Sequence, residues 1–141
     1  MVGTYKLLED VAISDAAFEA EGKNLNELFY ACASALFDTL ADVETVGESY
    51  VKEVILENKD IERLLFEFLE EIIYLKDVDS VVFKECVVNI DDSYKLKAIL
   101  KGEKINQKRH GLRSDVKAVT MHMFKLEKTS QGYMARIVLD I

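Results

Sequence analysis

The residues of this sequence best suited to chemistry are carboxylates, and one of them stands at its end, where the chain reads Leu139-Asp140-Ile141. A chain end usually frays, so an apolar residue beside a carboxylate suggests that something holds this segment. The Asp140 side chain, the terminal carboxylate of Ile141 and one internal carboxylate could together surround a hard cation. Oxygen-only ligand sets suit Ca²⁺ or Mg²⁺ better than Zn²⁺, so the pattern favours a divalent-cation site.

Several acids could supply the internal carboxylate. Asp15 lies where small apolar residues alternate with acids, and this alternation puts it on the less apolar side of a predicted strand. Glu9, Asp38 and Asp42 are equally suitable by composition. Exposed aspartates on strands often serve only solubility or block a sheet edge, so spacing alone does not choose among these acids.

A few basic and nucleophilic residues could accompany the acids. Lys117 opens the first strand of a C-terminal hairpin, either as an exposed edge charge or as a phosphate or carboxylate partner beside the metal acids. His122 falls inside that strand and is interpreted as half-buried and hydrogen-bonded, whereas His110 lies in a loop, where a surface role is expected. Neither histidine has the spacing of a zinc pair, and no Cys-x-x-Cys occurs.

The composition limits the function. The chain holds 18 Lys and Arg against 26 Asp and Glu, a formal net charge of −8, which disfavours stable direct binding of RNA or DNA. In a nucleic-acid pathway such a protein should act by touching a basic protein.

There is no apolar run long enough to span a membrane and no signal-peptide pattern at the start, so we expect a cytoplasmic protein. Cys32 and Cys86 sit in apolar patterns that indicate buried, inert thiols.

Hydrophobic periodicity and turn signals define the elements that must position these residues. Strands are predicted over residues 5–9, 12–21, 49–57, 81–91, 94–101, 116–128 and 132–141. Two helices are predicted after the capping residues Asn24 and Asp60, with apolar stripes that reach Leu40 and Leu75. Because the later part of the chain is strands only, the class is α+β: an antiparallel β-sheet scaffold with two packed α-helices, in a single domain over residues 1–141.

One stretch, residues 102–115, follows neither period. It contains a basic island on an otherwise acidic chain: Lys104, Lys108, Arg109, His110 and Arg113. Since it leads directly into the C-terminal hairpin, we expect it to lie beside the cation site, and irregular loops on a rigid scaffold often carry function. No glycine-rich phosphate loop or serine nucleophile elbow is present, so the residues predict no catalytic apparatus.

Four stretches resemble one known family. They are LLEDVAISDAAFEAEGKNLNELF, LLFEFLEEIIYLKDVDSVVF, the strand KAVTMH preceded by RHGLRSDV, and the Leu139-Asp140-Ile141 finish. Together they are similar to archease, an accessory factor of the RtcB-type tRNA-splicing RNA ligase. The family often reads His-Thr-Ala-Asp-x-Gly in its first motif, whereas residues 12–17 here read AISDAA. The aspartate, Asp15, is kept, while the histidine, threonine and glycine are not.

The resemblance implies site residues and a role. Asp15, Asp140 and a main-chain oxygen of Ile141 correspond to ligands of a divalent cation, for which Ca²⁺ is the first expectation, with Mg²⁺ and Mn²⁺ as alternatives. Lys117 corresponds to a required basic residue, and His110 and His122 match family positions without an assigned role.

The implied function is non-catalytic. The protein would dock on the RtcB-type ligase, promote its guanylylation and so allow multiple turnover, while the ligase holds the RNA. Two alternatives remain from the residues themselves: a metal-dependent phosphoester hydrolase that uses the same acids, and a plain protein-interaction module.

Overall fold

Both helices begin at a polar side chain that caps the first free N–H groups of the helix. The Asn24 side chain accepts a hydrogen bond from the Glu27 N–H at 2.9 Å at the start of α1 (Leu25–Leu40). Asp60 does the same for the first turn of α2 (Ile61–Asp79). Both starts are as the sequence predicts. α2 runs past the predicted stripe to Asp79, and the next residue, Ser80, is the C-cap in a left-handed conformation at φ 54°.

The computed structural model describes residues 2–8 and 15–141 and divides their strands between two antiparallel sheets. The first sheet has the order β1-β2-β7-β6, from β1 (Thr4–Leu8), β2 (Asp15–Gly22), β6 (Ala118–Thr129) and β7 (Gly132–Asp140). The second has the order β3-β5-β4, from β3 (Tyr50–Glu57), β4 (Val81–Ile90) and β5 (Lys95–Lys104). A short 3₁₀ helix, η1 (Val43–Thr45), follows α1. The α+β class and the antiparallel pairing agree with the sequence prediction.

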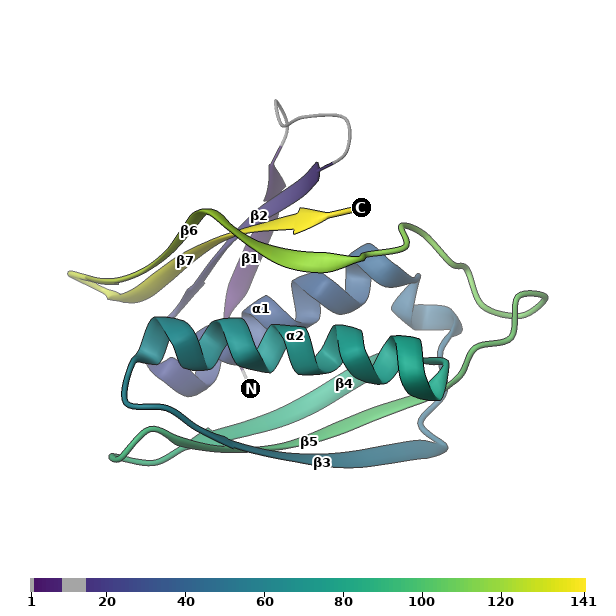
Figure 1. The fold of residues 1–141 in the computed structure, drawn as a ribbon, viewed down its shortest axis with the longest axis horizontal. Coiled ribbons are helices and arrows are strands. Elements are labelled where there is room, and N and C mark those ends of the chain that lie inside the picture. The colour runs from purple at the N-terminus through teal and green to yellow at the C-terminus, as the bar shows by residue number, and fades with distance from the viewer. Residues whose placement is uncertain (1, 9–14) are drawn as a thin grey trace.

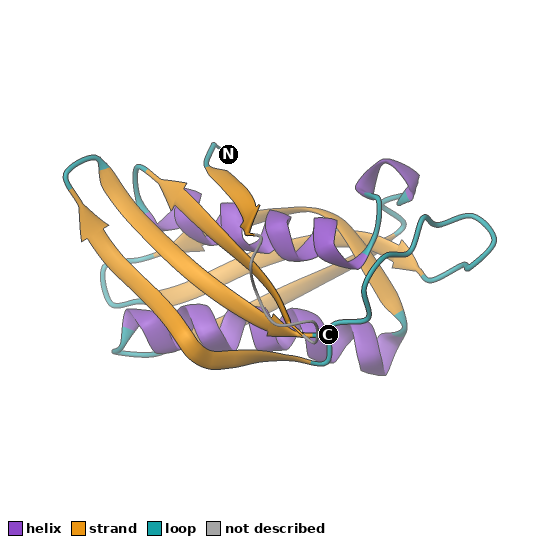
Figure 2. Ribbon diagram, turned by 90° about the horizontal axis from the view of Figure 1, so that it is seen from above, coloured by secondary structure: helices purple, strands orange, loops and turns teal. Residues whose placement is uncertain are grey.

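The two helices lie between the two sheets (Figure 1). Seen from above, the first sheet covers both helices, and the C-terminus lies over α2 (Figure 2). Apolar side chains from all three layers form one main core, in which Phe29 stacks on Phe68 and Phe37 packs against Phe83. Each helix contacts strands of both sheets, which explains why α1 and α2 are apolar over so wide an arc.

Alternation along β2 sets which side chains face the helices. Ala16, Phe18 and Ala20 point to the core, as predicted, and Asp15 and Glu19 point to the opposite face. The predicted strand residues 12–14, and Glu9 in the preceding one, lie outside the described residues.

The C-terminal hairpin forms as predicted, with one irregularity. The β6–β7 register is regular from Thr129 to Lys125 and again from Thr120 to Ala118, and it breaks between Thr120 and Lys125. Met123 lies within the break at a φ of 55°, so the edge strand bulges where the sequence shows continuous β pattern.

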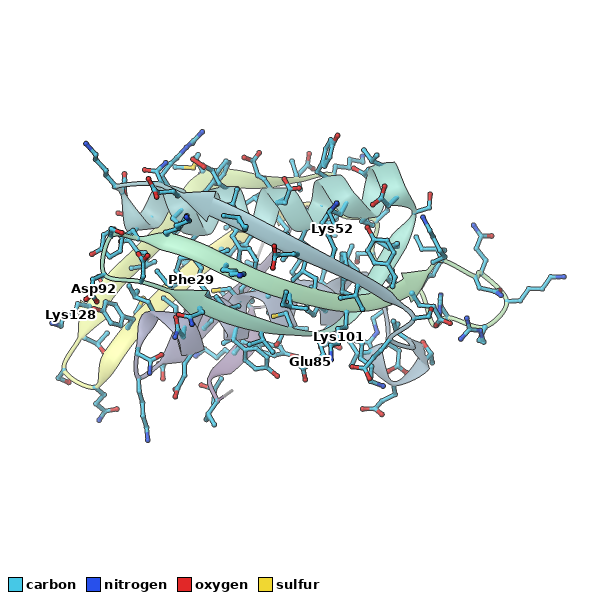
Figure 3. The ribbon with its side chains drawn as sticks, turned by 90° about the horizontal axis from the view of Figure 1, so that it is seen from below. Phe29, Lys52, Glu85, Asp92, Lys101 and Lys128 are labelled. Atoms are coloured by element: carbon cyan, nitrogen blue, oxygen red, sulfur yellow. The ribbon has the colours of Figure 1, made fainter. Side chains whose placement is uncertain are left out.

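The second sheet leaves its outer face open, as the view from below shows (Figure 3). Lys101 and Glu85 are labelled on that face, and they are directly opposed partners of β5 and β4. β5 continues to Lys104, so the irregular stretch begins at residue 105 and not at 102 as predicted. Gly102 allows this close pairing, because a Cβ there would lie 2.1 Å from the Val82 carbonyl oxygen.

Candidate cation site and docking end

Strand register brings together two of the acids that the sequence singles out. β2 and β7 are antiparallel neighbours, and Asp15 is the direct partner of Asp140. Directly opposed residues of an antiparallel pair share one face of the sheet, with Cβ atoms about 4.5–5.5 Å apart. Glu9 lies outside the described residues, and Asp38 is engaged on α1, where it pairs with Arg113 and accepts from the Tyr5 hydroxyl. Asp42 caps η1, where its side chain accepts from the Glu44 N–H. Asp15 is therefore the acid whose position fits the predicted site.

The end of the chain is held by pairing on both sides. β7 is an interior strand, with β2 on one edge and β6 on the other. The Lys117 N–H donates to the Asp140 carbonyl oxygen at 2.8 Å, and Ile141 is half-buried against the main core. The segment that the sequence marked as held is thus fixed by two strands and an apolar anchor, while the Lys117 side chain stays exposed.

Two carboxylates that face each other without a cation repel, because like charges directly opposed across strands destabilise a sheet. Within residues 2–8 and 15–141, neither Asp15 nor Asp140 makes an ion pair or a side-chain hydrogen bond. A divalent cation bound by oxygen atoms would relieve this repulsion, so the donor set fits Ca²⁺, Mg²⁺ or Mn²⁺. In the same described ranges no group of three or more His, Cys, Asp or Glu side chains could hold a metal. Main-chain oxygen from Ile141, water or a partner would have to complete the coordination.

A buried hydroxyl lies on the same face. Thr120 is the direct partner of Val138, two residues before Asp140 on β7, and its Oγ1 is buried. Among the described residues Oγ1 has no hydrogen-bond partner. Buried oxygen atoms are normally satisfied, so this one marks a polar spot on the face that carries the acids.

Lys76, which the sequence analysis missed, fixes the start of β6. Its side chain is 7% exposed, and its ammonium group donates to Asp115 Oδ1 at 2.7 Å and to the Val116 carbonyl oxygen at 2.8 Å. Asp77 Oδ1 lies 2.9 Å away. Burial alone lowers the pKa of Lys76, but the hydrogen bonds to Asp115 and Asp77 outweigh it and raise the pKa. The signal was available: Lys76 falls three and four residues after Ile73 and Ile72, on the apolar face of α2.

Most basic side chains of residues 104–113 are paired within the protein, although Lys108 is exposed. Arg113 pairs with Asp38, Arg109 pairs with Glu103, and the Lys104 ammonium donates to the Asp79 carbonyl oxygen. The loop backbone also pairs with the end of α1, where the Arg113 N–H donates to the Leu40 carbonyl oxygen. Residues 111–114 are thereby tied to α1 and η1, and the contact with Asp140 comes from Lys117, just after the loop.

His110 is buried, contrary to the surface position expected for it. Its side chain is 0% exposed, Nδ1 accepts the Asn106 N–H at 3.0 Å, and Nε2 lies 2.8 Å from Glu103 Oε1. Because Nδ1 accepts, Nε2 carries the hydrogen and donates to Glu103. Arg109, then His110 and the Gly47 N–H, hold the pKa of Glu103 at about 2. His110 therefore closes the loop on β5, away from the acid pair.

His122 is exposed, contrary to the half-buried position expected for it. It lies in the β6 bulge between Met121 and Met123, both more than half exposed. Phe124 is the residue of this segment that turns inward, with its ring edge-on to Phe66 of α2 at 5.7 Å. His122 is not brought to the acid pair by the register.

A groove adjoins the end of the first sheet that carries Asp15, Asp140 and Ile141, which we call the acid end. The groove has a volume of about 200 Å³ and is lined by residues of α2 and of the start of β6. Its lining residues are Glu70, Ile73, Tyr74, Asp77, Lys117, Ala118 and Val119. Lys117 is shared by the groove and the acid end, since its N–H binds Asp140. No local sequence pattern predicts the groove, because its two walls are distant in the chain.

These features define a class: an α+β protein in which two antiparallel sheets enclose two helices, with two opposed carboxylates at one end of the β2–β7 ladder. A family model described as "Archease protein family (MTH1598/TM1083)" matches residues 5–141. The chain belongs to the archease family. The protein archease of Pyrococcus abyssi is 40% identical over 132 residues, 91% of this chain and 93% of that protein. The protein archease of Methanosarcina mazei is 38% identical over 141 residues, 97% of this chain and 95% of that protein.

Solved structures agree on the fold. The solution structure of protein 1598 from Methanobacterium thermoautotrophicum superposes with a TM-score of 0.83 at 29% identity, over 97% of this chain and 98% of that one. A Thermotoga maritima structure, described as an archease and possible chaperone, has a TM-score of 0.67 at 18% identity and shows the fold alone. It covers 96% of this chain and 98% of that one. Among the described residues, neither helix is long and apolar enough to cross a membrane.

Proposed function

We propose that this protein is a non-catalytic cofactor of an RtcB-type RNA ligase in tRNA splicing, which promotes guanylylation of the ligase and so its multiple turnover. We further propose that Asp15, Asp140 and a main-chain oxygen of Ile141 hold a divalent cation. Calcium is the ion we propose, with magnesium and manganese as alternatives. The observation that carries the cation proposal is the direct opposition of two carboxylates that have no cationic partner among the described residues.

The acid end suits delivery of charge to a phosphate-rich site. When bound, a divalent cation supplies charge neutralisation for phosphate oxygens. Two side-chain carboxylates and one main-chain oxygen leave Ca²⁺ short of its usual six to eight ligands, so positions stay open for a partner. Lys117, exposed beside this end, would meet a phosphate or carboxylate of the ligase. The formal net charge of −8 fits a division of labour in which the ligase holds the RNA.

Two rivals have specific weaknesses. A phosphoester hydrolase needs a general base near the metal, and no described His, Cys or further acid joins the Asp15–Asp140 pair in a metal-binding group. A plain interaction module would leave the repulsion between the two carboxylates unexplained. Incubation with phosphoesters tests the first rival, and calorimetric titration with Ca²⁺, Mg²⁺ and Mn²⁺ tests the second.

The decisive experiment is repeated RNA joining by the ligase with a substoichiometric amount of this protein. We expect more product per ligase than the ligase makes alone, because each molecule of the cofactor reactivates many ligase molecules. No gain under turnover conditions would refute the proposed function.

Two variants test separately whether Asp140 and Lys117 are needed for stimulation of the ligase. Asp140→Ala should abolish calcium binding and most of the stimulation. Lys117→Ala should melt like the parent, because the backbone N–H that binds Asp140 is kept, yet it should lose stimulation. Unchanged stimulation by Asp140→Ala would remove the cation from the mechanism, and a large loss of stability in Lys117→Ala would make that lysine structural.

A further inference from the structure

The groove between α2 and β6 has the composition of a protein-docking surface. Tyr74 is 57% exposed on its α2 wall, and Ile73 and Val119 are apolar lining residues. β6 runs antiparallel to α2 here. Lys76, near the end of α2, binds Val116 just before β6, whereas Phe66, near the start of α2, packs on Phe124 later in β6. Met121, 57% exposed, follows Val119 on the same strand. Tyr and Met are both enriched at interface centres relative to the rest of the protein surface.

The charge of the groove selects the partner. α2 carries six acids and two bases, a net charge of −4, and one of those bases, Lys76, is buried and already bonded to three oxygen atoms. Glu70 makes no ion pair or side-chain hydrogen bond among the described residues, and Asp77 is 57% exposed although Lys76 contacts it. The one cation of the lining, Lys117, stands at the end nearest Asp140. The rest of the groove is therefore complementary to positive charge.

Helix geometry places an aromatic ring between the two acids. Glu70, Tyr74 and Asp77 are spaced by four and three residues, so they form one stripe on successive turns of α2. A guanidinium or ammonium group over the Tyr74 ring would gain a cation–π contact and lie within reach of carboxylates on both sides.

We propose that this groove receives an arginine or lysine side chain of the partner protein, held against Tyr74 between Glu70 and Asp77. The inference rests on the proposed function, because the partner is the enzyme that the neighbouring Asp15–Asp140 end serves. Lys117 joins the two surfaces into one interface, since its side chain lines the groove while its backbone binds the strand that carries Asp140. The groove binds the partner, and the Asp15–Asp140 end presents the proposed cation to it.

The test measures the affinity of this protein for the purified RtcB-type ligase. Glu70→Lys and Tyr74→Ala should each weaken binding by about tenfold, equivalent to about 1.4 kcal/mol. Calcium affinity, measured by calorimetry without the ligase, should stay as in the parent. Glu48→Lys, the same charge reversal at an exposed residue in the loop before β3, is the matched control and should bind as the parent does. Higher salt should weaken the parent complex more than the Glu70→Lys complex.

The outcomes separate the two proposals. If the parent neither binds nor stimulates the ligase, the proposed function fails and the inference fails with it. If the parent binds and Glu70→Lys binds within twofold of it, the groove is not the contact, although the proposed function stands. If sedimentation of the parent alone shows a dimer that Glu70→Lys dissociates, the occupant is a second copy of this chain and the inference is overturned.

Discussion

At the residue scale, the acid pair couples folding to the proposed cation binding, because only the folded sheet brings Asp15 and Asp140 together. Asp15 and Asp140 are held opposite each other by seven further residue pairs of the β2–β7 ladder, so their backbones cannot separate without loss of ladder hydrogen bonds. The sheet therefore imposes their repulsion on the free protein, and the cation proposed for this site would relieve it.

Asp140→Asn should consequently have opposite effects with and without calcium. In a chelator, we expect the variant to be more stable than the parent by about 0.2–1 kcal/mol, because one like charge is removed. With calcium at about 100 times its Kd, the parent should gain about 2.7 kcal/mol and the variant far less. Thermal melts in both buffers measure this reversal. A variant less stable than the parent in chelator would show that the two carboxylates do not repel.

At the element scale, Lys76 is the link between α2 and the start of β6. Lys76→Met keeps the apolar stem but leaves the buried Val116 carbonyl without its side-chain donor, which should cost about 1–3 kcal/mol. Lys97→Met is the matched control, because its ion pair with Glu53 is exposed and should contribute less than about 1 kcal/mol. Urea denaturation of both variants gives the comparison. Equal losses would mean that Lys76 contributes no more than a surface charge.

The 105–115 loop should be sensitive to acid through Glu103. The pKa of Glu103 is held at about 2 in the folded protein, below its ordinary 4.5, by Arg109 first and His110 second. A depressed pKa means that folding favours the ionised form. Its contribution is thus complete above pH 4.5 and is lost as the pH falls from there toward 2.

Glu103→Gln should remove this pH dependence and loosen the loop at neutral pH. We expect faster amide hydrogen exchange around Asn106 and Gly111, with little change in α2, because the Gln amide replaces a charge-assisted contact with a neutral one. Hydrogen exchange followed by mass spectrometry measures it. Unchanged exchange in the loop, or a parent-like acid profile, would show that other contacts hold it.

At the scale of the whole molecule, the two sheets close over the helices and bury both thiols. Cys32 lies on α1 and Cys86 on β4, and neither is in a disulfide, as the sequence predicts. Burial raises the pKa of both thiols, and that of Cys86 to about 12.

Neither cysteine should react with a thiol reagent such as Ellman's reagent in the folded protein at pH 8, and both should react in denaturant. The rate in native buffer should follow global unfolding, because both thiols lie in the main core. Rapid labelling of one thiol without denaturant would reveal a local opening of the layer between α1 and β4.

The sequence by itself determined the elements and the chemistry on offer. Caps at Asn24 and Asp60, the alternation in β2 and the paired strands of the hairpin are local signals, since each depends on residues a few positions apart. It also indicated an oxygen-rich end at Asp140 and, by resemblance, the family to which the chain belongs.

Only the tertiary structure decided which distant residues meet. The choice of Asp15 over Asp38 follows from the β2–β7 register, and no local pattern encodes the partner strand. The burial of His110, the exposure of His122 and the groove beside Lys117 likewise depend on how loops and layers pack. The physical reason is the same for each: periodicity records which side of its own element a residue faces, whereas proximity is set by contacts between elements far apart in the chain.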